Sequence, residues 1–66
     1  MIVRVNGRDM EVRDGATVGD LIDMLGHPRD RVAVEIDGEI CPRSMHGRTL
    51  LRAGQTVEIV SFVGGG

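Results

Sequence analysis

The sequence contains no lysine, tryptophan or tyrosine, and it has a single cysteine, Cys41, and a single aromatic residue, Phe62. One cysteine excludes an internal disulfide and a zinc site built on several cysteines, so we expect a reducing, cytoplasmic setting. One aromatic ring provides no platform for stacking bases, and a net charge of −2 provides no attraction to nucleic acid. No apolar run approaches the ~20 residues of a membrane-spanning helix, and residues 1–4 lack the apolar core of a secretory signal. We therefore predict neither nucleic acid nor membrane as a partner.

The length of the chain limits what it can contain. Sixty-six residues have room for one small domain with one apolar core, and for no deep active-site cavity. A content of 41% hydrophobic and 27% charged residues is typical of a folded domain rather than of a disordered chain. We therefore predict that the chain is not an enzyme by itself.

All eight basic residues are arginine. A nucleotide bias that favours arginine codons accounts for this composition. A second interpretation is chemical: without lysine, the only primary amine is that of Met1. An activated carboxyl group on this chain would then find few amines to acylate.

Alternating apolar residues predict five strands, at residues 2–6, 10–13, 32–36, around Ile40, and 56–63. Asn6-Gly7 and Asp37-Gly38 are expected to form turns, since these residue types tolerate positive φ. The side chains expected to face the core are Val3, Val5, Met10, Val12, Val32, Val34 and Ile36. Residues 41–49 are expected to be irregular, and Leu50 and Leu51 to close the bottom of the core.

A short helix is predicted after Thr17. Thr17 is the expected N-cap, with Asp20 as its partner in a capping box. One apolar stripe is formed by residues at helical spacing, namely Val18, Leu21, Ile22 and Leu25. Asp20 and Asp23 are expected to face water, and Gly26 and Pro28 to end the helix after about nine residues.

This order of elements is strand, strand, helix, strand, short strand, strand. It predicts an α+β fold in which one helix packs across a mixed sheet, with the first and last strands as a central parallel pair. Such an arrangement is the β-grasp, or ubiquitin-like, fold. We assign residues 1–63 to this domain and residues 64–66 to a flexible glycine tail.

Conventional catalytic constellations are weak in this sequence. Cys41 and His46 form a conceivable nucleophile pair, but Cys41 is more simply explained as a small apolar filler. His27 is expected on the surface after the helix. The histidines, the cysteine and the acids have no metal-ligand spacing, so no metal site is predicted. The acidic residues are spread along solvated faces, and no two are expected to be forced together.

The glycines at 64–66 have two interpretations. They are a frayed end or an expression remnant, or they form a tail that lacks side chains and threads a channel too narrow for Cβ atoms. A phosphate-binding loop is not expected, because such a loop is followed by a helix N-terminus. We expect Gly64, Gly65 and Gly66 to enter the active sites of partner enzymes.

Strand alternation adds a second candidate feature. If Val57 and Ile59 point inward, then Glu58, Val60 and Phe62 share the outer face. Val60 and Phe62 would then form an apolar patch for partner docking, with Phe62 as its anchor. The alternative is that residues 41–49 cover both side chains.

Three stretches resemble a known family, namely residues 40–43 (Ile-Cys-Pro-Arg), 51–60 (Leu-Arg-Ala-Gly-Gln-Thr-Val-Glu-Ile-Val) and 62–66 (Phe-Val-Gly-Gly-Gly). With the β-grasp order, they resemble the sulfur-carrier proteins of thiamine biosynthesis, the ThiS family. The family commonly has valine in place of Cys41, tryptophan in place of His46 and aspartate in place of Gln55. We expect these differences at surface and turn positions. The third glycine still leaves Gly65 and Gly66 as the terminal pair.

The resemblance implies a mechanism and a set of partners. An adenylating enzyme of the ubiquitin-activating type, using ATP and magnesium, would convert the Gly66 carboxylate to an acyl-adenylate. A sulfur donor protein, a cysteine desulfurase or a rhodanese, would supply persulfide sulfur to give a thiocarboxylate at Gly66. The tail would then deliver this sulfur to a thiazole synthase. The chain would bind no cofactor itself.

Other functions remain open from the sequence. The small subunit of molybdopterin synthase has the same fold and tail, although such chains tend to be longer and richer in aromatic residues. Sulfur carriers for cysteine or methionine synthesis are a further possibility. A ubiquitin-like modifier would form isopeptide bonds with protein lysines, and a plain interaction module would have an inert tail.

Overall fold

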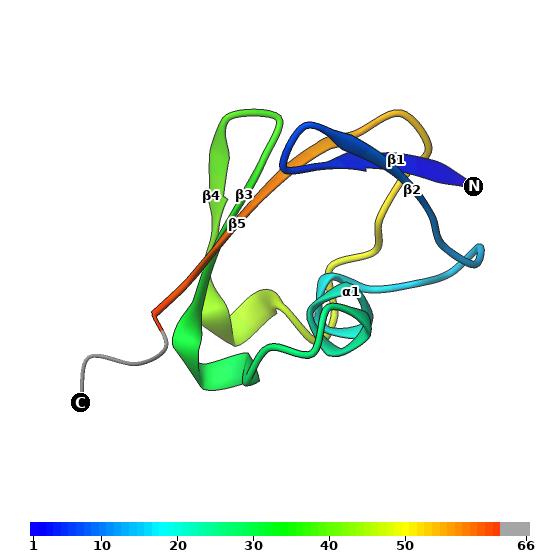
Figure 1. Ribbon diagram of the computed structural model, residues 1–66. Helices are drawn as coiled ribbons and strands as arrows, with labels where there is room; N and C mark the ends of the chain where they lie inside the picture. The colour runs from blue at the N-terminus through cyan, green and yellow to red at the C-terminus, as the bar shows by residue number, and fades with distance from the viewer. Residues whose placement is uncertain (63–66) are drawn as a thin grey trace.

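A computed structural model of the chain describes residues 1–62, which form a five-stranded sheet with one α-helix on one face (Figure 1). In chain order the elements are β1 (Ile2–Val5), β2 (Arg8–Glu11), α1 (Val18–Met24), the 3₁₀ turn η1 (Arg29–Arg31), β3 (Val32–Ile36), β4 (Glu39–Cys41), the 3₁₀ turn η2 (Arg43–Met45) and β5 (Thr56–Ser61). The predicted order of strands and helix is confirmed. β5 ends at Ser61, earlier than the predicted end of the strand at Val63. Val63 itself and the tail at Gly64, Gly65 and Gly66 lie outside the described residues.

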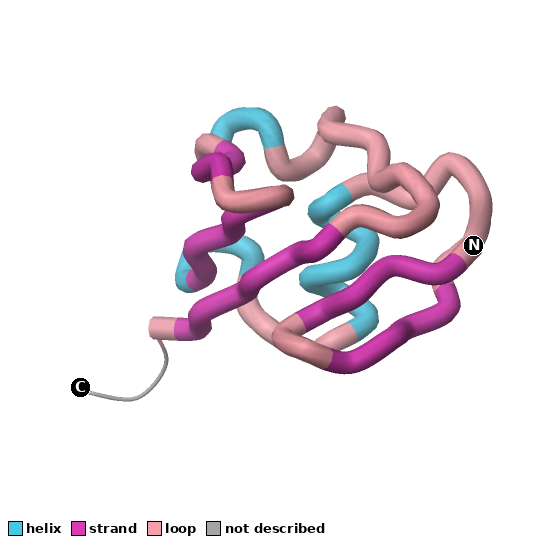
Figure 2. Tube along the Cα trace, turned by 90° about the horizontal axis from the view of Figure 1, so that it is seen from above, coloured by secondary structure: helices cyan, strands magenta, loops and turns pink. Residues whose placement is uncertain are grey.

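The sheet has the order β2-β1-β5-β3-β4. β1 and β5 are parallel neighbours, with Arg4 beside Thr56 and Val5 beside Val57, while β3 runs antiparallel to β5 over five residue pairs. Figure 2 shows β5 as the long central strand, with β1 on one side and β3 on the other. The predicted central parallel pair, and with it the α+β mixed sheet of the β-grasp fold, is confirmed.

The first hairpin begins earlier than predicted. Val5 pairs with Arg8, so the connection consists of Asn6 and Gly7 alone, with φ values of 49° and 82°. Positive φ at both positions is the geometry of a type I′ turn, whose twist matches that of the flanking strands. This tight turn starts β2 at Arg8 rather than at residue 10. Val12 follows the strand but is still buried.

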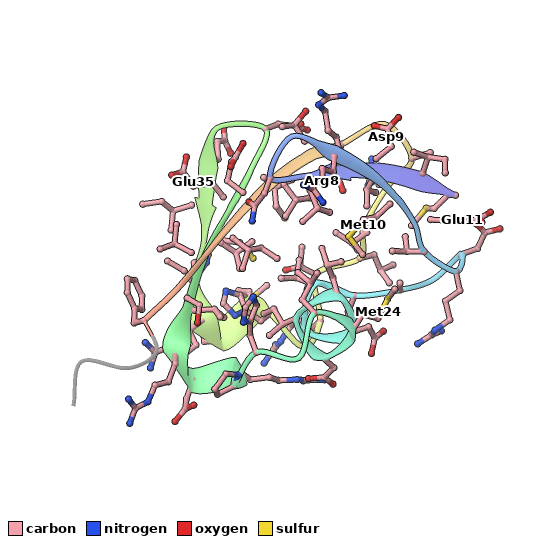
Figure 3. All side chains as sticks on the ribbon, in the orientation of Figure 1. Arg8, Asp9, Met10, Glu11, Met24 and Glu35 are labelled. Carbon is pink, nitrogen blue, oxygen red and sulfur yellow. The ribbon has the colours of Figure 1, made fainter. Side chains whose placement is uncertain are left out.

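The core lies between the sheet and α1. Its buried members are Val3, Val5, Val12, Ala16, Val18, Leu21, Ile22, Val32, Val34, Cys41, Leu51, Val57 and Ile59. Met10, Leu25 and Ile36 pack against it partly buried, so the expectation that Met10 and Ile36 face the core is confirmed. Figure 3 shows Met10 on the α1 side of β2 and Asp9 on the opposite side.

Only one of the two adjacent leucines closes the core. Leu51 is 4% exposed, whereas Leu50 is 58% exposed, so the prediction for Leu50 was wrong. Leu50 forms an isolated antiparallel bridge with Thr17, and the Leu51 N–H donates to the Ala16 carbonyl at 2.9 Å. In such extended backbone, consecutive side chains point to opposite sides, so Leu50 points outward when Leu51 points inward.

The helix begins with the predicted capping box. The Thr17 hydroxyl accepts from the Asp20 main-chain N–H at 3.1 Å, and the Asp20 carboxylate accepts from the Thr17 main-chain N–H at 2.9 Å. Because of these contacts Asp20 is partly buried rather than fully turned to water. The helix has seven residues, and Gly26 follows its C-cap with a φ of 76°. No helix within residues 1–62 is long and apolar enough to cross a membrane.

Candidate functional site

The end of β5 presents two apolar side chains to solvent. Val57 and Ile59 are buried, and Val60 and Phe62 are each 56% exposed. The Phe62 N–H donates to the carbonyl of Arg31, the last residue of η1, at 2.7 Å, so the chain stays attached to the body as far as Phe62. Val60 and Phe62 are therefore not covered by residues 41–49. This end of β5 lies across the molecule from the N-terminus (Figure 1).

Asn6 holds this part of β5 in place. Its side-chain amide accepts from the Ile59 N–H at 2.8 Å and donates to the Ile59 carbonyl at 3.1 Å. The main-chain N–H of the same residue donates to the Val57 carbonyl at 2.9 Å. The Asn6 side chain thus continues the β1–β5 pairing past the point where β1 turns away. Sequence reasoning identified Asn6 only as a turn residue.

The outer face of the sheet, the face away from α1, continues the patch from β5 onto β3 and β4. Ala33 lies directly opposite Val60, and Ile40 is 78% exposed. Figure 3 shows Glu35 on this face. Glu35 is the direct cross-strand neighbour of Glu58, and both are exposed. The expectation that no two acids are forced together was therefore wrong.

Cys41 and His46 are part of the core. Cys41 is 8% exposed and His46 is 3% exposed, so the expectation that these positions lie on the surface was wrong. The His46 Nε2 donates to the Cys41 carbonyl at 3.0 Å, and the Cys41 thiol lies 3.7 Å from the Thr49 hydroxyl. The contact that joins them is with the Cys41 carbonyl and not with the thiol. The pair is structural, and Cys41 is the predicted apolar filler.

The two carboxyl groups whose pKa is lowered, those of Asp20 and Asp23, lie on α1. The main-chain N–H of Thr17 holds the pKa of Asp20 below its ordinary value of 3.8. The Arg29 guanidinium donates to Asp23 at 3.0 and 2.7 Å and lowers the pKa of that carboxyl in the same way. These groups stabilise the start of α1 and its contact with η1. Neither lies on β5 or on its neighbours in the sheet.

No set of three or more histidine, cysteine, aspartate or glutamate side chains in residues 1–62 is placed to hold a metal ion. The structure places the two predicted docking residues close together in the chain, Val60 near the end of β5 and Phe62 directly after it. Gly64, Gly65 and Gly66, the residues predicted to enter partner active sites, lie outside the described residues. Their roles stay predictions.

Comparisons with known proteins agree with this architecture. The family model described as the ThiS family matches residues 3–66. A crystal structure of the thiamine biosynthesis protein (ThiS) of Geobacter metallireducens is 32% identical, with a TM-score of 0.81 and full coverage of both chains. A solution NMR structure of a thiamine biosynthesis protein from that organism has a TM-score of 0.82 at 32% identity, covering 100% of this chain and 88% of the other.

Two curated relatives are longer proteins. A thiazole synthase of Paramagnetospirillum magneticum is 37% identical over 62 residues, which are 94% of this chain and 19% of that protein. A thiazole synthase of Magnetococcus marinus is 32% identical over 66 residues, which are 100% of this chain and 20% of that protein. The chain therefore spans about a fifth of the length of these two relatives.

Proposed function

Because this chain belongs to the ThiS family, we propose that it is a sulfur carrier for thiazole formation in thiamine biosynthesis. The observation that carries the proposal is the family match over residues 3–66, together with a body that superposes on a ThiS structure with a TM-score of 0.81. The chain acts as a protein co-substrate and leaves catalysis to its partners.

The reactive group in this proposal is the carboxylate of Gly66. A carboxylate resists nucleophilic attack because it is negatively charged. An adenylating enzyme therefore joins it to AMP from ATP, releases pyrophosphate and makes the carbonyl carbon electrophilic. Persulfide sulfur from a donor protein displaces AMP, and a thiol then cleaves the sulfur–sulfur bond to leave the thiocarboxylate. Its sulfur is polarisable and nucleophilic.

The folded body and the glycines have different tasks. Glycine lacks Cβ, so Gly64, Gly65 and Gly66 fit a narrow channel and adopt the backbone angles that the channel requires. Val60 and Phe62 are exposed on the strand that leads to these glycines, and they dock the body against the partner enzyme. The absence of lysine leaves the acyl-adenylate few amines of its own chain with which to react.

The thiazole synthase is the acceptor that the comparisons favour. In two relatives, a segment similar to this chain makes up about a fifth of a protein that carries the name thiazole synthase. A carrier domain and its acceptor enzyme joined in one chain would keep the two at a high effective concentration. This observation favours thiamine biosynthesis over the other pathways that use sulfur carriers.

The proposal is tested by intact-mass measurement. The full chain is incubated with its adenylating enzyme, ATP, magnesium and a persulfide donor. Its mass should rise by the difference between one sulfur and one oxygen atom, and fragmentation should place the change at Gly66. Samples without ATP, and a chain without Gly65 and Gly66, serve as controls. An unchanged mass with an enzyme shown to adenylate would refute the carrier role, and conjugates to protein lysines would indicate a modifier.

A further inference from the structure

Two carboxylates lie side by side on adjacent strands of the sheet, and neither forms an ion pair within the described residues 1–62. Glu35 on β3 and Glu58 on β5 are direct cross-strand neighbours, and both are exposed. The ion pairs formed within residues 1–62 join Arg4 to Asp9, Arg13 to Asp20, Arg29 to Asp23 and the Met1 amine to Asp14. None of them involves Glu35 or Glu58. Like charges directly opposite destabilise a sheet, so this pair lowers the stability of the free protein.

Apolar side chains lie beside this acidic pair on β4 and toward the end of β5. Ile40 is the cross-strand neighbour of Glu35 on β4 and is 78% exposed. The next outward-facing pair along β3 and β5 is Ala33 and Val60, and Phe62 follows. Neighbouring exposed apolar side chains mark an interaction surface. The two carboxylates beside them favour a partner that brings positive charge.

We propose that this face binds the adenylating enzyme, which places one arginine or lysine side chain between the carboxylates of Glu35 and Glu58 and apolar side chains over Ile40, Val60 and Phe62. The inference rests on the proposed function. Of the partners, the adenylating enzyme is the one required whichever pathway receives the sulfur. A guanidinium suits the position best, because its planar set of donors can hydrogen-bond to both carboxylates.

Charge complementarity makes this proposal specific. A cation between the two carboxylates removes their mutual repulsion, so binding relieves an unfavourable interaction that the free protein contains. The same substitution should therefore have opposite effects on folding and on binding. A merely structural role for Glu35 or Glu58 would move both properties in the same direction.

The test uses the full chain with Glu35→Gln, Glu58→Gln and the two combined. Each single variant should unfold at a higher urea concentration than the parent protein and bind the adenylating enzyme about tenfold more weakly. The effects of the two substitutions on binding should not add, since both remove parts of one contact. The affinity difference from the parent protein should shrink at high salt. Glu58→Lys should weaken binding further than Glu58→Gln.

Glu11→Gln is the matched control, because Glu11 is an exposed carboxylate on the far edge strand β2 and its loss changes the net charge equally. It should leave the affinity within about twofold of the parent value. Unchanged binding by the Glu35 and Glu58 variants would overturn the inference. The inference would also be overturned if the substitutions weakened binding to the thiazole synthase alone. The same holds if they weakened only the self-association of this chain. The carrier role would survive each of these results if the mass change at Gly66 still occurs at saturating enzyme.

Discussion

The side-chain amide of Asn6 is hydrogen-bonded to both main-chain groups of Ile59, although 53 residues separate them in the sequence. The contact occurs because the Asn6-Gly7 turn carries β1 away from β5 before β5 ends. The amide has one acceptor and one donor at nearly the spacing of a peptide group, so it takes the place of the next residue of the ladder. A turn residue thereby fixes the strand that leads to the proposed docking surface.

Asn6→Gly should lower the free energy of unfolding by about 1–3 kcal/mol, because the N–H and the carbonyl of buried Ile59 lose their partners. Glycine accepts the positive φ of this position, so the loss reports the side chain and not the turn. Urea unfolding measures it. Asn6→Asp keeps an acceptor for the Ile59 N–H, so its free energy of unfolding should lie between those of Asn6→Gly and the parent protein. Equal stability of Asn6→Gly and the parent protein would contradict the bracing role.

Leu51→Ala should lower the free energy of unfolding by about 2–5 kcal/mol, the range found when a buried leucine is truncated and a cavity remains. Leu50→Ala should change stability by about 0.5 kcal/mol or less, since its side chain is already in water. Thermal unfolding of the two variants gives a direct comparison. A larger loss for Leu50→Ala would mean that the orientation of this pair is the reverse of the one described.

His46→Ala should destabilise the protein by about 2–4 kcal/mol, because it leaves a cavity and removes the donor to the Cys41 carbonyl. His46→Phe retains the ring volume and should cost only about 1 kcal/mol. The loss of the hydrogen bond to the Cys41 carbonyl is partly offset in His46→Phe. The phenyl ring has no equivalent of the His46 Nδ1, which is buried without a partner within residues 1–62. Denaturant titrations of both variants test this order, and a more stable His46→Ala than His46→Phe would refute it.

Acid should weaken the start of α1. The pKa of Asp20 is lowered in the folded protein, mainly by the hydrogen bond from the Thr17 main-chain N–H. The folded value is thus below the unfolded one, so the stabilisation is complete above the ordinary value of 3.8 and is lost as the pH falls through the lowered pKa. Unfolding free energies measured across this range should decline less steeply for Asp20→Asn than for the parent protein.

Thr17→Ala separates the two halves of the capping box. It removes the hydroxyl acceptor and should cost about 1 kcal/mol. It retains the main-chain N–H that contributes most to the low pKa of Asp20, so an NMR titration of this carboxyl should still give a value below 3.8. A return to the ordinary value would show that the hydroxyl is the main cause.

Phe62→Ala should change the free energy of unfolding by about 0.5 kcal/mol or less, because the ring is more than half exposed. It should weaken binding to the adenylating enzyme about tenfold, as expected for an aromatic anchor in an interface. Ile2→Ala is the matched control, since Ile2 is 47% exposed on β1, away from the end of β5. Loss of folding in Phe62→Ala would place this ring in the core.

Several tertiary relationships could not be predicted from local pattern. His46 is buried because the Gly19 N–H donates to the His46 carbonyl at 2.7 Å and draws η2 against α1. Glu35 and Glu58 become neighbours only through the register of β3 against β5. Each depends on contacts between segments that are distant in the sequence, and such contacts leave no periodic signal in either segment.

The sequence by itself determined the features whose cause is local. These are the Asn6-Gly7 turn, the Thr17–Asp20 capping box, the alternation of β5 that turns Val60 and Phe62 outward, and the order of elements that specifies a β-grasp sheet. Only the tertiary structure decided that Leu51 and not Leu50 is buried, that Asn6 braces Ile59, and that two glutamates face each other beside an apolar patch. Turn geometry and side-chain period are properties of a few adjacent residues, whereas register and burial are set by how the whole chain packs.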